Sequence, residues 1–356
     1  MLNNEKLYLI KILTWSSAFI IVLFHYGLWF GLNFYEENIF IDYLVKRKKY
    51  GANFVYLYWT IIGYIFILFY HSKKKIILKN FFINIFARYY PLHILTLIIV
   101  FIIQYLNLNL YGKTEFGYAN DFYHFILHIF FASDWGLHVK QSFNAPIWFM
   151  SILIPIFIYF FLSFKILIEH RFFFSISTMI FFYYIFPFIF DSHKSIFNIQ
   201  ACFFYFYLGI SIFFISELKN KYKKKFQILS VFGIIISLFA LNYKGILFLD
   251  LINNIPSTVL LFTSLIFLCQ NYYIKPSHKS RMINTFINSS YSIYLWHFPL
   301  QLTFLIIIKF LNFDQSLFKN LIFFFIFLIF LFLISLISLK KFEIPCEKLI
   351  KKISEK

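Results

Sequence analysis

Long apolar runs that are almost free of charge are the feature of this chain that most restricts its fold. A membrane-spanning helix needs about 20 predominantly apolar residues, and runs of that kind recur along the 356 residues. The predicted spans are residues 8–32, 52–70, 82–106, 145–168, 172–190, 197–216, 226–242, 255–274, 286–311 and 318–339. The sequence therefore predicts an all-α polytopic membrane protein with about ten transmembrane helices in one bundle.

The composition excludes an ordinary soluble protein. Charged residues make up only 13% of the chain and apolar residues 61%, whereas a soluble domain carries about 25% charged residues. The 56 phenylalanines exclude a disordered chain. Because no connection between the predicted spans is long enough for a separate domain, we expect one transmembrane domain over residues 6–348. A basic cytoplasmic tail, 349–356, follows it.

The net charge of +18 is explained better by membrane topology than by binding to nucleic acid. Ten helices put both termini on one side of the membrane. The segments on that side carry about twice as many Lys and Arg residues as those on the other side. The positive-inside rule therefore predicts cytoplasmic termini in a bacterial inner membrane, with Arg171 inside and Glu115 and Lys309 outside.

Few ionisable side chains fall inside the predicted spans: His25, Arg88, His93 and His297, with Lys11 low in the first span. A charge at the centre of a bilayer-spanning helix costs at least ~2.5 kcal/mol, so each of these residues is a functional candidate. The alternative for a histidine is a hydrogen bond between helices. No predicted span carries a mid-membrane carboxylate, which disfavours a cation-coupled transporter and a glycosidase-like pair.

Two of these residues suit a phosphate-bearing ligand at the cytoplasmic face. Lys11 lies 14 residues before His25, nearly four helical turns, so both side chains point to about the same side. The guanidinium of Arg88 stays charged and fits a phosphate or carboxylate, although anchoring to lipid headgroups is an alternative. The three cysteines, by contrast, are far apart and indicate neither a disulfide framework nor a metal site.

Seven short motifs then follow one another along the chain. They are His25 in the first span, NFVYLYWTIIGY around Gly63, FARYYPLH, NAPIWFMS, FYFYLG, SSYSIYLWHFPL and FEIP. In this order they resemble the membrane acyltransferase-3 family, which includes the O-acetyltransferases of bacterial surface polysaccharides. The resemblance extends over nearly the whole chain.

The resemblance implies roles for individual residues. In the family, the histidine of the first helix is treated as the catalytic base. The resemblance implies the same role for His25. The other matching residues are Arg88 and Pro91; Asn144, Pro146, Trp148 and Ser151; Tyr291, Tyr294, Trp296 and His297; and Glu343 and Pro345. We accordingly predict acyl-CoA binding by Lys11 and Arg88. We also predict that Trp148, Tyr291, Trp296 and His297 line the substrate path, with no metal.

Two positions depart from the family pattern. The family usually has an arginine eleven residues before the histidine, where this chain has Thr14, one turn above Lys11. It also usually has a glutamate five residues after the tryptophan of the fourth motif, where this chain has Leu153. Lys11 could supply the missing positive charge, whereas no nearby residue obviously replaces the glutamate.

The resulting functional hypothesis is an integral-membrane O-acyltransferase. It would move an acetyl or other short acyl group from cytoplasmic acyl-CoA, a donor substrate rather than a bound cofactor, to a hydroxyl group. The acceptor would be a cell-envelope polysaccharide, such as lipopolysaccharide, or a glycolipid, and the lipid bilayer is the remaining partner. A polysaccharide flippase or exporter is one alternative. A catalytically impaired scaffold is another, suggested by Thr14 and Leu153.

Overall fold

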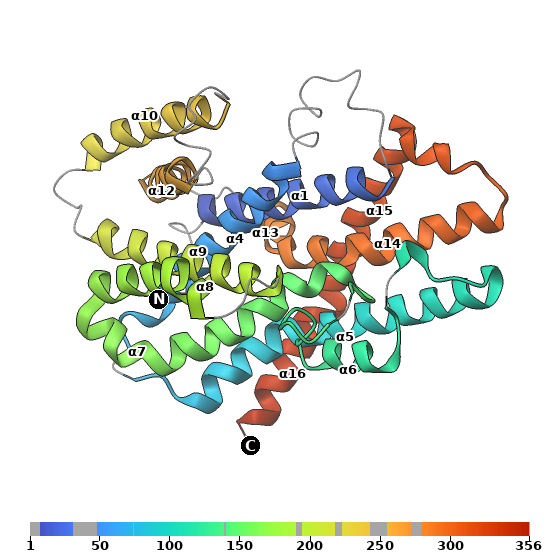
Figure 1. The fold of residues 1–356 in the computed structure, drawn as a ribbon, viewed down its shortest axis with the longest axis horizontal. Coiled ribbons are helices and arrows are strands. Elements are labelled where there is room, and N and C mark those ends of the chain that lie inside the picture. Colours follow the sequence, from blue (N-terminus) through green and yellow to red (C-terminus); the bar gives the residue numbers. More distant parts are fainter. Residues whose placement is uncertain are drawn as a thin grey trace.

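The computed structural model describes residues 8–30, 48–73, 75–117, 119–138, 140–189, 194–217, 223–242, 255–271 and 280–355. These residues form helices joined by turns, and no strand occurs among them. α14 lies between α1 and α5 and packs against both, whereas α10 lies at the edge of the bundle next to α12 (Figure 1).

The helices follow the apolar runs. They are α1 (Tyr8–Phe30), α4 (Lys48–Tyr70), α5 (Leu78–Tyr111), α6 (Phe122–Ile129), α7 (Trp148–Ile180), α8 (Phe186–Ile189), α9 (Lys194–Glu217), α10 (Lys223–Asn242), α12 (Ile255–Asn271), α13 (Ser280–Asn288), α14 (Ser290–Phe310), α15 (Leu321–Ser338) and α16 (Ile344–Ser354). Short 3₁₀ turns are η1 (Glu115–Gly117), η2 (Ala145–Ile147) and η4 (Gln315–Lys319), and π turns are η3 (Phe181–Ile185) and η5 (Leu339–Glu343).

Within the described residues, seven helical segments are long and apolar enough to cross a membrane. They are Tyr8–Phe30, Asn53–Tyr70, Leu78–Tyr111, Ala145–Ile185, Asn198–Glu217, Ser290–Phe310 and Leu321–Ser354. Two further apolar helices, Lys225–Ala240 and Ile255–Gln270, are shorter. The all-α polytopic fold is thus confirmed, while the number of ten crossings stays a prediction.

The longest of these segments is folded back on itself at Arg171. The backbone of Arg171 (φ 41°, ψ −113°) lies outside the helical region, in the middle of α7. The rings of Tyr159 and Phe182 are 5.7 Å apart, whereas 23 residues of straight helix would separate them by about 35 Å. α7 is therefore a helical hairpin, in agreement with the two separate runs predicted over 145–168 and 172–190.

Two glycines allow α4 and α9 to pack closely. A Cβ atom on Gly63 would lie 1.9 Å from the carbonyl oxygen of Phe206, and one on Gly209 would lie 1.9 Å from that of Thr60. Small residues of this kind let helix backbones approach each other in membranes. Two of the seven sequence motifs, those around Gly63 and Gly209, thus meet in a helix contact that stabilises the fold.

Three ion pairs agree with the predicted sidedness. They are Arg88–Glu347 (3.6 Å), Arg171–Glu217 (4.0 Å) and Lys309–Glu115. The Lys309–Glu115 pair joins two residues predicted to lie outside, and Arg88 and Arg171 are both predicted to lie at the inner face. We refer below to the Arg88 end and the Glu115 end of the bundle, since α5 and α14 both run from the first to the second.

Candidate active site

Two histidines from α1 and α14 meet inside the bundle. His25 Nδ1 lies 2.9 Å from His297 Nε2, and the two rings are nearly parallel, with centroids 5.1 Å apart. Trp29, one turn after His25, stacks on both rings, at 4.9 Å from His25 and 5.8 Å from His297. The predicted base is therefore in direct contact with His297, which is predicted to line the substrate path.

Hydrogen bonds assign the tautomers of this histidine pair. His297 Nδ1 is hydrogen-bonded to the carbonyl oxygen of Tyr294, and a carbonyl oxygen only accepts, so Nδ1 carries the proton. In the neutral ring His297 Nε2 is then an acceptor, and His25 Nδ1 donates to it. The Nε2 atom of a neutral His25 is consequently unprotonated. A lone pair held in this way is what a general base requires.

A cavity of about 150 Å³ lies at the Arg88 end. Its lining includes Lys11 and Thr14 of α1, Arg88 of α5 and Tyr291 of α14. Tyr291 Oη donates a hydrogen bond to the carbonyl oxygen of Tyr89, which joins α14 to α5 beside the cavity. The structure thus brings together both residues predicted to bind acyl-CoA and one predicted to line the substrate path.

The cavity and the histidine pair lie at different depths. Tyr291 precedes His297 by six residues on α14, about 9 Å along the helix axis, and Thr14 precedes His25 by eleven residues, about 16 Å. An anion bound by Lys11 and Arg88 would therefore sit at the Arg88 end, and only an extended group could reach the histidines.

Arg88 already has a carboxylate partner. Its guanidinium lies 3.6 Å from Glu347 Oε2 on α16, and Glu347 Oε1 accepts a 2.6 Å hydrogen bond from Lys351. The Arg88 side chain remains 31% exposed. A phosphate in the cavity would share this guanidinium with Glu347.

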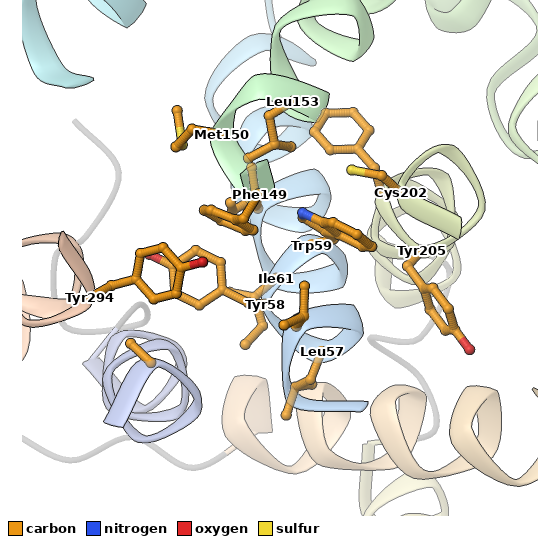
Figure 2. Packing of buried hydrophobic residues seen from close by; sticks show 14 of the residues in the cluster. Leu57, Tyr58, Trp59, Ile61, Phe149, Met150, Leu153, Cys202, Tyr205 and Tyr294 are labelled. Carbon is orange, nitrogen blue, oxygen red and sulfur yellow. The ribbon is translucent and has the colours of Figure 1, made fainter. Parts of the chain in front are cut away.

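Trp148 and Trp296 are both predicted to line the substrate path. Trp296 is a buried residue of the apolar core, and Trp148 packs against that core. The indole of Trp148 packs edge-on against that of Trp59, with ring centroids 5.8 Å apart. No described ring contact joins either tryptophan to His25. The segment containing Trp148 supports α14 in another way, because the carbonyl oxygen of Pro146 accepts a 2.6 Å hydrogen bond from Tyr294 Oη. Figure 2 shows Tyr294 beside Tyr58 and Phe149 in this packing.

His93 lies apart from the histidine pair. Its Nε2 atom donates a 2.7 Å hydrogen bond to the carbonyl oxygen of His128, and its ring stacks on Phe131 at 4.3 Å. These contacts join α5 to α6 and the turn that follows α6. A histidine in a predicted span is either a functional candidate or a hydrogen-bond partner between segments. His93 fits the second interpretation.

Glu343 of the FEIP motif is a buried structural carboxylate. Its Oε1 atom accepts hydrogen bonds from Ser292 Oγ (2.6 Å) and Ser338 Oγ (3.0 Å), which join η5 to α14 and α15. The sequence placed this residue beyond the last span. The helical segment in fact continues through η5 and α16 to Ser354, so Glu343 lies within it.

Comparison with known proteins identifies the family of this chain. A model of the acyltransferase domain of the acyltransferase-3 family matches residues 10–340, which include the histidine pair, Lys11 and Arg88. The chain belongs to the acyltransferase-3 family. It is accordingly a membrane acyltransferase. No curated protein and no solved structure matches it significantly.

The structure shows the surroundings of Thr14 and Leu153, the two residues that depart from the family pattern. Thr14 lines the cavity in this acyltransferase, and Lys11 lines it too, so a positive charge is present beside the position of the usual arginine. Leu153 is fully buried in the core that contains Phe149 and Trp59 (Figure 2). An apolar residue fits those surroundings, where an ionised carboxylate would be costly.

Two residues next to the histidine pair of this acyltransferase are not among those predicted from the sequence. Trp29 follows His25 by four residues, and Gln301 follows His297 by four residues, so each lies one turn further on the same helix face. The i, i+4 spacing was the available signal. Applied to the two histidines, it would have identified both residues.

Proposed function

We propose that this acyltransferase moves an acetyl or other short acyl group from acyl-CoA to a hydroxyl group of a cell-envelope polysaccharide or glycolipid. The observation that carries the proposal is the hydrogen-bonded series from the Tyr294 carbonyl oxygen through His297 to His25. It leaves His25 Nε2 unprotonated inside a membrane bundle.

The histidine pair suits the chemistry of such a transfer. An alcohol hydroxyl is a poor nucleophile, so a base has to take its proton as the oxygen attacks the thioester carbonyl carbon. His25 Nε2 takes that proton, the C–O bond forms and the C–S bond breaks. The protonated His25 then returns the proton to the departing thiolate of CoA. General-base catalysis of this kind contributes about 10²–10⁴-fold in rate.

The cavity at the Arg88 end suits the donor. CoA carries phosphates, and Lys11 and Arg88 bring two cationic side chains to the cavity lining. If the Arg88 end is cytoplasmic, as the charge distribution predicts, cytoplasmic acyl-CoA enters there and its pantetheine arm extends toward His25. Reporter fusions after Lys113 and at the C-terminus should then report opposite sides of a bacterial inner membrane. Equal reports, or a report that the C-terminus is external, would contradict this orientation.

Acyl transfer by the purified protein tests the proposal. Membranes of the source cell supply the acceptor, and [¹⁴C]acetyl-CoA supplies the label. We expect incorporation with the wild-type protein and a loss of at least about 10²-fold with His25→Gln, which keeps a hydrogen-bonding group but no base. Exposed His170 provides the matched control, since His170→Gln should transfer normally.

Two results would contradict the proposal. Full activity of His25→Gln would make His25 a packing residue. Absence of transfer by the wild-type protein with every short acyl-CoA would favour the scaffold or transporter alternatives. Binding of CoA to His25→Gln, measured by calorimetry, shows that the variant is folded.

A further inference from the structure

One amide group beside the histidine pair has no partner. Gln301 lies one turn beyond His297 on α14, toward the Glu115 end, and its side chain is 0% exposed. Neither its amide nitrogen nor its amide oxygen has a hydrogen-bond partner among the described residues. Buried polar groups in proteins are nearly always paired, and most strictly so in a membrane. Gln301 therefore has the properties of a ligand-binding residue.

Polar groups continue from Gln301 to the Glu115 end. Lys309, two turns further along α14, pairs with Glu115. Glu115 Oε1 also accepts a 2.9 Å hydrogen bond from Asn107 Nδ2, and the Glu115 backbone N–H donates to Gln104 Oε1 at 2.9 Å. Within the part of the chain that is described, Gln104 Nε2 and Asn107 Oδ1 are unpaired. Polar atoms with unused hydrogen-bonding capacity thus lie on α5 and α14 between the histidines and this end.

Aromatic rings accompany these polar groups. Trp29, which stacks on both histidines, lies 5.8 Å from the ring of Phe116 in η1 and packs edge-on against Phe298 at 4.7 Å. Trp29 is only partly buried. An aromatic face beside unpaired amide groups suits a ligand with both C–H surface and hydroxyl groups.

Acyl-CoA is not the ligand expected at Gln301, because the residues predicted to bind acyl-CoA lie at the opposite end of the bundle. Lys11 and Arg88 line the cavity at the Arg88 end, whereas Gln301 is displaced from His297 toward Glu115. The two substrates of a direct transfer have to approach the base together. The side left for the acceptor is the one that carries Gln301.

We propose that Gln301 binds the acceptor and selects one with two neighbouring hydroxyl groups, as in a sugar ring. The amide oxygen accepts from the non-reacting hydroxyl and the amide N–H donates to the oxygen of that same hydroxyl, while Trp29 packs against the ring. The reacting hydroxyl then faces His25 Nε2. This inference rests on the proposed function.

Two small acceptors that differ by one hydroxyl group test the inference. Purified protein is given acetyl-CoA with trans-1,2-cyclohexanediol or with cyclohexanol, and kcat/KM is measured for each acceptor. We expect the wild-type protein to prefer the diol and Gln301→Met to lower the diol-to-alcohol ratio about tenfold. Thr303 lies on another face of α14, where its hydroxyl bonds to the Pro299 carbonyl oxygen, so Thr303→Val should keep the wild-type ratio.

Thermal stability separates binding from a structural role. A residue that pairs with another helix would lower the Tm when replaced, whereas removal of an unpaired buried amide should leave the Tm of Gln301→Met equal to or above that of the wild type. A lowered Tm, an unchanged diol-to-alcohol ratio in Gln301→Met, or no diol preference in the wild type would overturn the inference. If acetyl-CoA consumption depends on His25 but the ratio is unchanged, only this inference fails. If the wild type consumes no acetyl-CoA, the proposed function fails with it.

Discussion

Replacement of His297 should lower kcat without changing the apparent affinity for the donor. In His297→Leu, the 2.9 Å hydrogen bond that holds His25 Nδ1 is lost, and His25 can then take the unproductive tautomer with the proton on Nε2. One neutral hydrogen bond is worth about 0.5–1.5 kcal/mol, which corresponds to a two- to twelvefold fall in kcat. The shift in tautomer lowers kcat further.

The comparison with His297→Gln makes this prediction specific. A glutamine side-chain oxygen can still accept from His25 Nδ1, so kcat should decrease in the order wild type, His297→Gln, His297→Leu. The KM for acetyl-CoA should be the same in all three, because His297 does not line the cavity at the Arg88 end. Steady-state assays of CoA release measure both quantities. Wild-type kcat in His297→Leu, or a raised donor KM with unchanged kcat, would refute the positioning role.

Three further predictions concern other parts of the molecule. Arg88→Ala should raise the KM for acetyl-CoA by the equivalent of about 1.5–3 kcal/mol. Glu347→Gln should lower this KM, because Glu347 competes with phosphate for the Arg88 guanidinium. An unchanged KM in Arg88→Ala would favour lipid anchoring by Arg88. Gly209→Ala should destabilise the protein by at least about 1–3 kcal/mol, because the alanine Cβ would lie 1.9 Å from the Thr60 carbonyl oxygen. The measurement is the Tm, which should fall. An unchanged Tm would contradict the close packing of α4 and α9. Hydrogen bonds from the backbone N–H and ring of His124 lower the pKa of Asp121 at the start of α6. The stabilisation of α6 by the ionised Asp121 cap is therefore present above the usual aspartate pKa. It is lost as the pH falls through the lowered pKa of Asp121. The protection factors of α6 amides, which compare their exchange with the intrinsic rate at the same pH, should therefore fall at low pH and in Asp121→Ala at neutral pH, and equal protection in the variant would exclude the cap.

Hydropathy predicted the helices well because length and apolarity are what a membrane demands of a helix. It ended the last span near residue 339, where lysines and Glu343 begin. The helix continues to Ser354, and inside the bundle Glu343 Oε1 accepts hydrogen bonds from Ser292 and Ser338. Ser292 is 51 residues from Glu343 in the sequence, so this pairing is not visible in a local window.

The site was predictable where charge was the signal. Lys11 and Arg88 are costly in a bilayer, which singled them out, and the structure places both at one cavity. Tryptophan carries no such signal, because a ring that fills the core and a ring that lines a substrate path have the same apolar surroundings in sequence. The family resemblance alone assigned Trp148 to the path, which stays a prediction, and the structure shows its ring against that of Trp59.

The tautomer of His25 tests the central claim most directly. ¹⁵N NMR of protein labelled at histidine distinguishes protonated from unprotonated ring nitrogens, and subtraction of the His25→Gln spectrum isolates the His25 signals. At neutral pH we predict a protonated Nδ1 and an unprotonated Nε2. A protonated Nε2 on His25 would contradict the assignment of this residue as the base.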